Sequence, residues 1–169
     1  MVLDLAQVKQ DITDWIINFV EVPHPALGGW PPCPYARAAR LKQSYEVVLG
    51  NDPWLDLRRR ALEGLQNREV WIYVYDPTKW SHKILSQSIE YANRDFLIDK
   101  DIIALEDHPD DVEDVNGVIM NQGKYALALV QSLSDLNVKA RTMAGKGFYD
   151  SWPESYLKGL FQHRQDPRS

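Results

Sequence analysis

The sequence predicts a single domain of the α+β or α/β class, with a central mixed sheet of about four strands covered by helices. Three observations support this fold class. The chain has 169 residues, which suits one hydrophobic core. Segments with helical and with β-strand character broadly alternate. One of them, residues 70–75, is continuously apolar and rich in β-prone residues, as expected of a central strand. We expect the domain to span residues 1–164 and residues 165–169 to form a disordered tail.

The individual elements follow from apolar spacing and helix-end signals. A helix is predicted from Leu5 to about Val20, because apolar residues recur at helical spacing, Asp4 can cap its start and Pro23 cannot continue it. The other helices are predicted at residues 34–41, 54–65, 80–96 and 133–143 and from Ser151 onward, and the strands at 45–49, 70–75, 102–105 and 125–130, with another short strand considered at 118–120. The triplet Arg58-Arg59-Arg60 is expected on the solvent face of its helix.

Composition excludes several classes of protein. The formal net charge of −5 argues against nucleic-acid binding, which depends on neutralising phosphates. No run approaches the roughly 18 apolar residues that a membrane span needs. The N-terminus lacks the pattern of a signal peptide, and the single cysteine cannot form an internal disulfide. A cytoplasmic location is therefore predicted.

The most informative segment is residues 23–34, which holds five prolines and two glycines and ends beside Cys33. We predict that Pro34 opens a helix and that Cys33 is its N-cap residue. Backbone N–H groups and the nearby Arg37 and Arg40 would then lower the pKa of the thiol and make it a catalytic nucleophile or redox sensor. The alternative is a buried structural cysteine, since free cysteines are among the most buried residues.

His108 is the second candidate, because it follows the predicted strand 102–105 within an acidic run. It could act as a general base toward Cys33, oriented by Asp107 or Asp110, or serve as one metal ligand. The alternative is a solvated acidic turn. The run lacks the spacing of a calcium-binding loop, so no metal or other cofactor is assigned.

Four further residues are predicted to bind a ligand: His24, Trp30, Arg37 and Arg40. The arginines could hold a carboxylate or phosphate at the start of a helix, which predicts an anionic small molecule as the ligand. The alternative is that these arginines simply form the solvent face of a helix.

Two short motifs resemble an uncharacterised bacterial domain family. The matching residues are Trp15 in the first helix, Cys33-Pro34-Tyr35-Ala36, His108-Pro109, Asn121 and Tyr125-Ala126-Leu127. The loop before Cys33 is longer and richer in proline than is usual in that family, and the aromatic and arginine residues usual after the His-Pro motif are missing. The family has no established activity, so the resemblance implies only that Cys33 and His108 are paired site positions.

Two functions are therefore open. The first is a small-molecule-binding or thiol-dependent enzyme-like protein with its site between the Cys33 and His108 loops. The second is a non-catalytic interaction domain that binds a protein partner or a second copy through exposed aromatic residues. Those residues would be Trp30, Tyr35, Trp152 and Tyr156. Whether the protein is an enzyme is left open.

Overall fold

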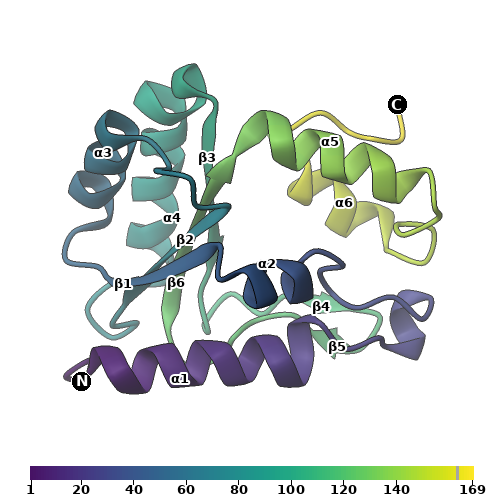
Figure 1. Cartoon of the computed structure of the whole chain (residues 1–169), viewed down its shortest axis with the longest axis horizontal. Coiled ribbons are helices and arrows are strands. Elements are labelled where there is room, and N and C mark those ends of the chain that lie inside the picture. Colours follow the sequence, from purple (N-terminus) through teal and green to yellow (C-terminus); the bar gives the residue numbers. More distant parts are fainter. Residues whose placement is uncertain (163) are drawn as a thin grey trace.

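A computed structural model describes residues 1–162 and 164–169, and these form an α+β domain around a four-stranded mixed sheet, as predicted (Figure 1). The strands are β1 (Tyr45–Leu49), β2 (Val70–Tyr75), β3 (Ile102–Asp107) and β6 (Ala126–Ser132), in the order β1-β2-β6-β3. Strand β1 runs parallel to β2, while β6 is antiparallel to both of its neighbours. The predicted central position of β2 is confirmed.

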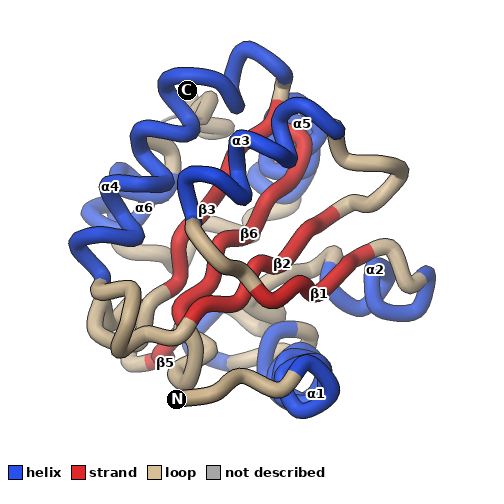
Figure 2. The backbone as a smooth tube through the Cα atoms, turned by 90° about the vertical axis from the view of Figure 1, so that its left-hand side faces the viewer, coloured by secondary structure: helices blue, strands red, loops and turns tan. Residues whose placement is uncertain are grey.

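One face of the sheet is covered by α3 (Pro53–Glu63) and α4 (His82–Ala92), which stand in front of the strands in Figure 2. Because side chains alternate along a strand, β2 sends Trp71, Tyr73 and Tyr75 to this face and Ile72 and Val74 to the other. The two helices begin at side-chain caps, with Asp52 accepting a hydrogen bond from the Leu55 N–H and Ser81 one from the Ile84 N–H.

The other face is covered in part by α1 (Leu5–Trp15), which lies along the bottom of the molecule in Figure 1. Asp4 accepts from the Gln7 N–H at 3.0 Å, which confirms the predicted cap. The helix continues through a turn of π-helix, Ile16–Val20, and its buried Val8 and Ile12 pack in one cluster with sheet residues.

The rest of the chain builds a lobe beside this second face. It contains α5 (Leu133–Ala144), α6 (Glu154–Leu160), the two-stranded ribbon β4 (Asp114–Val115) and β5 (Val118–Ile119), and the proline-rich segment. The segment is ordered by a short 3₁₀ turn, Pro25–Leu27, and places Leu27 in a core otherwise rich in aromatic side chains. We call this assembly the α5–α6 lobe.

Two local predictions were wrong. Helix α2 spans Ala36–Lys42 with Tyr35 as its cap residue, so Pro34 does not open it and Cys33 does not cap it. Arg60 is buried instead of exposed, because its guanidinium lies 3.5 Å from the centroid of the Trp71 ring and donates to the Tyr73 hydroxyl.

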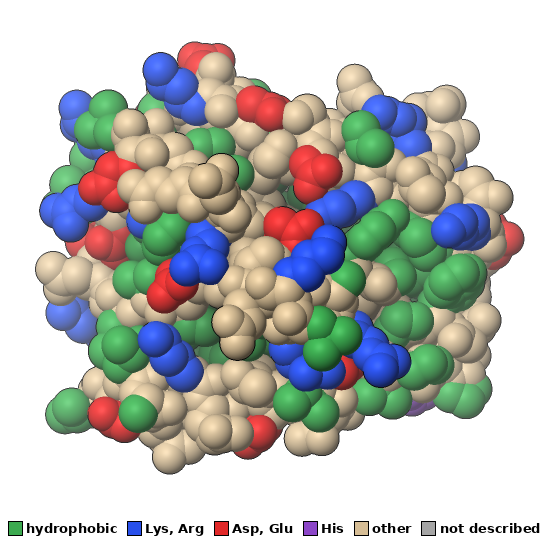
Figure 3. Space-filling model, viewed as in Figure 1, with side chains coloured by type: hydrophobic (Ala, Val, Ile, Leu, Met, Phe, Trp, Pro, Cys, Tyr) green, Lys and Arg blue, Asp and Glu red, His purple; other side chains and the backbone are tan. Residues whose placement is uncertain are grey.

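Three further features concern the C-terminal end, the helices and the surface of the protein. Within the predicted tail, Arg168 Nη1 lies 2.6 Å from Glu154 Oε2 at the start of α6. Among the described helices, none has the length and apolar character needed to cross a membrane. On the face shown in Figure 3, basic and acidic side chains are interspersed, and hydrophobic ones gather on the right, the side of the α5–α6 lobe.

Candidate functional site

A cavity of about 1050 Å³ lies between the sheet and the α5–α6 lobe. Its sheet side includes Leu105 of β3 and Leu129 and Gln131 of β6. Its other walls come from the end of α1, from the α5–α6 lobe with its proline-rich segment, and from α4, which reaches the lining at Ser86 and Glu90. The hydrophobic side chains of the lobe and those of the α1 face form two separate core clusters, and the cavity is lined from both. The space is thus left where the two cores do not meet.

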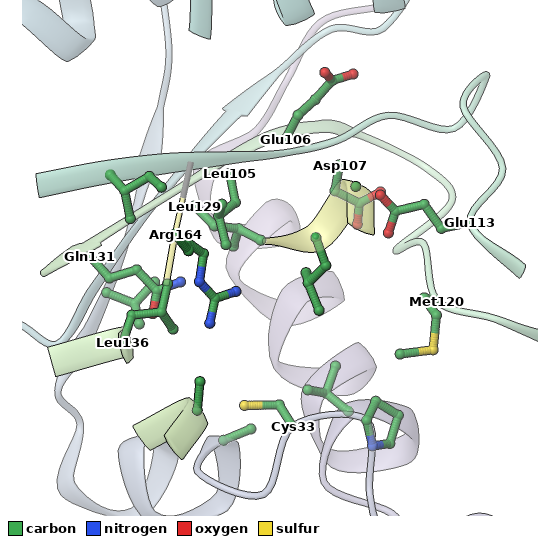
Figure 4. Close-up of a pocket in the computed structure, with 18 of the residues that line it drawn as sticks. Cys33, Leu105, Glu106, Asp107, Glu113, Met120, Leu129, Gln131, Leu136 and Arg164 are labelled. Carbon is green, nitrogen blue, oxygen red and sulfur yellow. The ribbon is translucent and has the colours of Figure 1, made fainter. Parts of the chain in front are cut away.

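Two carboxyl groups mark one end of the cavity. Asp107 and Glu113 lie close together with their side chains directed toward each other (Figure 4). Strand alternation turns Leu105 and Asp107 to the cavity side of β3, and Glu106 points the other way. Asp107 accepts hydrogen bonds from the Gln122 N–H at 2.9 Å and the Asn121 amide at 3.0 Å. Burial nevertheless raises the pKa of Asp107.

Glu113 is the more perturbed of the two acids. Burial and the nearby Asp107 carboxylate raise the pKa of Glu113 to about 7, and the Tyr156 hydroxyl, which donates to Oε2 at 3.2 Å, opposes this shift. Both causes favour the neutral acid. This end of the cavity can therefore hold or release a proton near neutral pH.

Cys33 also lines the cavity, with its sulfur directed into it (Figure 4). Burial raises the pKa of the thiol, although the backbone N–H groups of Tyr35 and Ala36 act in the opposite direction. The residue as a whole is half-buried. The shift is opposite in direction to the one expected from the sequence, since desolvation of a thiolate outweighs two N–H donors.

His108 lies outside the cavity lining and is almost fully buried. Its Nδ1 accepts a hydrogen bond from the Asp110 N–H at 3.1 Å, so Nε2 must donate to the Trp80 carbonyl at 2.9 Å. Both nitrogens are thus used in fixing the loop after β3. The structure brings Cys33 and Asp107 to one cavity but does not bring His108 there.

The four predicted ligand-binding residues also fall outside the lining. Arg40 forms a bidentate ion pair with Glu21 at 2.7 and 2.9 Å, and Arg37 is exposed. His24 accepts from the Ala26 N–H and caps the 3₁₀ turn, and Trp30 packs edge-on against Phe148. His24 and Trp30 thus help to hold the proline-rich segment in place, whereas Arg37 and Arg40 belong to α2.

The aromatic patch expected for an interaction domain is mostly internal. Trp152 is buried, and Trp30, Tyr35 and Tyr156 are half-buried and pack against the core of the α5–α6 lobe. Their main contribution is to the lobe itself, so the surface proposed for a protein partner lacks its expected anchors.

Sequence reasoning missed several polar groups of the cavity, among them Glu113, Gln131 and Arg164. Gln131 is on β6, where alternation could have placed it beside Leu129. Glu113 was one of several acids in a run, and Arg164 lay at the end of the predicted domain, with no spacing to connect either to β6. The folding of the lobe over the sheet brings them together.

Among the described residues, one group of side chains could hold a divalent cation, and two of its three members, Glu106 and Asp111, also line the cavity. The ligand atoms of His82, Glu106 and Asp111 lie within 4.8 Å of one another. The His82 Nδ1 is 2.6 Å from Glu106 Oε1. Partial burial lowers the pKa of His82, but the hydrogen bond to Glu106 and the charges of Glu106, Asp111 and Asp110 together outweigh it, and the net shift is upward. A proton on the His82 imidazole already balances the neighbouring carboxylates, as a bound cation would.

No family model, curated protein or solved structure matched the chain. The resemblance to an uncharacterised bacterial family stays a prediction, and the assignment of function rests on the geometry of the cavity.

Proposed function

We propose that the protein binds a small molecule with a largely apolar body in the cavity between the sheet and the α5–α6 lobe. One observation carries the proposal: the cavity has a volume of about 1050 Å³, and hydrophobic side chains make up most of its lining. Ligand sites commonly have volumes of roughly 300–1,000 Å³ with a few polar groups among apolar ones.

A second candidate is a thiol-dependent reaction in the same cavity. It is favoured by the position of Cys33, whose sulfur faces the cavity with the Tyr35 and Ala36 N–H groups near it. It is disfavoured by burial, which keeps the thiol protonated, and by the engagement of both His108 nitrogens elsewhere. Binding without covalent chemistry is therefore the better-supported function.

The test uses a neutral apolar fluorophore, N-phenyl-1-naphthylamine, whose emission rises in a dry environment. Leu129→Trp adds bulk at the cavity side of β6, and we expect it to weaken dye binding at least tenfold. Leu62→Trp is the matched control, since Leu62 is exposed on α3, which covers the opposite face of the sheet.

The two variants separate cavity binding from surface adsorption. Near-UV circular dichroism and the melting temperature establish that each variant is folded. Equal binding by both variants, or no binding by the wild type, would contradict the proposal.

A further inference from the structure

Three buried donor groups have no hydrogen-bond partner among the described residues, and all three belong to residues that line the cavity. They are the indole N–H groups of Trp15 and Trp152 and the Nε–H of Arg164. A fourth unpartnered atom, Asn137 Oδ1, belongs to a residue outside the lining. An unpaired buried donor costs about 1–3 kcal/mol, so native proteins seldom leave several of them around one space.

Arg164 differs from the other cation of the cavity in its charge balance. Lys139 Nζ lies 2.9 Å from Asp135 and 3.5 Å from Glu69, so two carboxylates balance it. Within the described ranges, Arg164 forms no ion pair. Its guanidinium charge instead lies against an aromatic ring, since Cζ is 4.8 Å from the centroid of the Phe161 ring. Burial lowers the pKa of Arg164, and the nearby Tyr149 hydroxyl partly offsets this.

The direction of the Arg164 guanidinium also bears on what the cavity can bind. In Figure 4 it points into the cavity beside Gln131 and Leu136, across from the Asp107 and Glu113 carboxyls. Leu105 and Leu129 lie between the two ends. The cavity thus has an acidic end, an apolar middle and an end at which the Arg164 guanidinium carries a positive charge that no described carboxylate balances. A guanidinium binds a carboxylate, phosphate or sulfonate through parallel N–H···O bonds.

We infer that the ligand of this cavity is an amphipathic oxyanion whose charged group is bound by Arg164 and whose apolar body lies against Leu105 and Leu129. This inference rests on the proposed function. It replaces the anion site expected at Arg37 and Arg40, because Arg40 is already paired with Glu21. It also orients the ligand, since the charged group must lie away from Asp107 and Glu113.

Two dyes with the same apolar body test the inference. 1-Anilinonaphthalene-8-sulfonate carries a sulfonate, and N-phenyl-1-naphthylamine does not. We expect the wild type to bind the sulfonate at least tenfold more tightly than the neutral dye at pH 8. Arg164→Met should abolish this preference and leave binding of the neutral dye unchanged. Arg164→Lys should retain part of it, and Arg59→Met, an exposed arginine on α3, should retain all of it.

The outcomes separate the two proposals. Equal binding of the two dyes by the wild type overturns the oxyanion assignment and leaves cavity binding intact, whereas binding of neither dye overturns both. An Arg164→Met protein that keeps the preference overturns the role of Arg164. So does an Arg164→Met protein that loses both dyes together, because the side chain would then support the shape of the cavity instead of the charge of the ligand. Competition by dodecanoate but not dodecanol extends the result to carboxylates.

Discussion

The Tyr156 hydroxyl lies 3.2 Å from Glu113 Oε2 and donates a hydrogen bond to it across the acidic end of the cavity. This contact joins α6 to the loop after β3, two segments 43 residues apart in the chain. Glu113 is also the acid whose pKa is raised to about 7. The contact between the lobe and the sheet-side loops is therefore the place where pH should act on the protein.

Glu113→Gln should remove part of the pH dependence of stability. The pKa of Glu113 is raised from 4.5 in an unfolded chain to about 7 in the folded one, so the folded state binds more protons between these values. The stability that this proton binding by Glu113 adds to the folded state is complete below pH 4.5 and is lost as pH rises through 7. We expect the variant to fall less in unfolding free energy than the wild type between pH 5 and 8, as measured by urea denaturation. Asp99→Asn, which alters an exposed carboxyl, is the control. Parallel pH profiles of Glu113→Gln and wild type would refute the expectation.

Cys33 should react slowly with iodoacetamide in the folded protein. Burial raises the pKa of the thiol, and only the thiolate is nucleophilic. We expect the midpoint of the pH–rate profile to lie above the ordinary value of about 8.5, and the rate at pH 7 to be at least tenfold below that of the urea-unfolded chain. A midpoint below 8 would instead revive the thiol-dependent candidate. Mass spectrometry of the labelled protein measures both quantities.

Arg60→Ala should destabilise the fold by about 2–4 kcal/mol, because it removes hydrogen bonds to Tyr73 and Gly64 and leaves the buried tyrosine hydroxyl unpaired. The stacking on Trp71 is lost as well. Arg59→Ala, at the neighbouring exposed position, should change stability by no more than about 0.5 kcal/mol. Chemical denaturation of both variants gives the comparison, and similar values for the two would show that the buried contacts of Arg60 contribute little.

Two glycine substitutions should act in opposite directions. A Cβ on Gly50 would lie 2.0 Å from Cε1 of the buried Tyr75 ring, so Gly50→Ala should cost at least about 1–3 kcal/mol through overpacking. A Cβ on Gly159 of α6 would meet no described atom within 4 Å. Gly159→Ala should therefore add about 0.5–1 kcal/mol through helix propensity. Thermal unfolding measures both, and a loss of stability at Gly159 would contradict this account of α6.

Sequence reasoning succeeded where the signal is local. The cap at Asp4, the strand 70–75 and the helix that begins after Ser132 each depend on residues within a few positions of one another. It failed at Arg60. The triplet of arginines predicted a solvent-exposed face, but Arg60 is buried. Whether an arginine on a helix is exposed depends on the aromatic residues of the strand beneath it, and the register of Trp71 and Tyr73 against α3 is a tertiary property.

For the candidate site, too, some residues that the sequence singled out line the cavity and another does not. Cys33 and Asp107 were singled out from their neighbours in the chain, and both line the cavity. His108 was singled out by the same argument and is held outside it, because its two nitrogens bind the Asp110 N–H and the Trp80 carbonyl. Sequence distance alone cannot tell a histidine that faces a cavity from one that fixes a loop.

The sequence by itself determined the fold class, most elements and the central position of β2, because apolar periodicity and helix caps act over a few residues. The tertiary structure alone decided that the lobe core and the α1 core do not meet, which leaves the cavity. It also decided that Arg164 enters that cavity from near the end of the chain, opposite Asp107 and Glu113. These relations depend on how separate elements pack, and packing is set by contacts between residues that no local pattern connects.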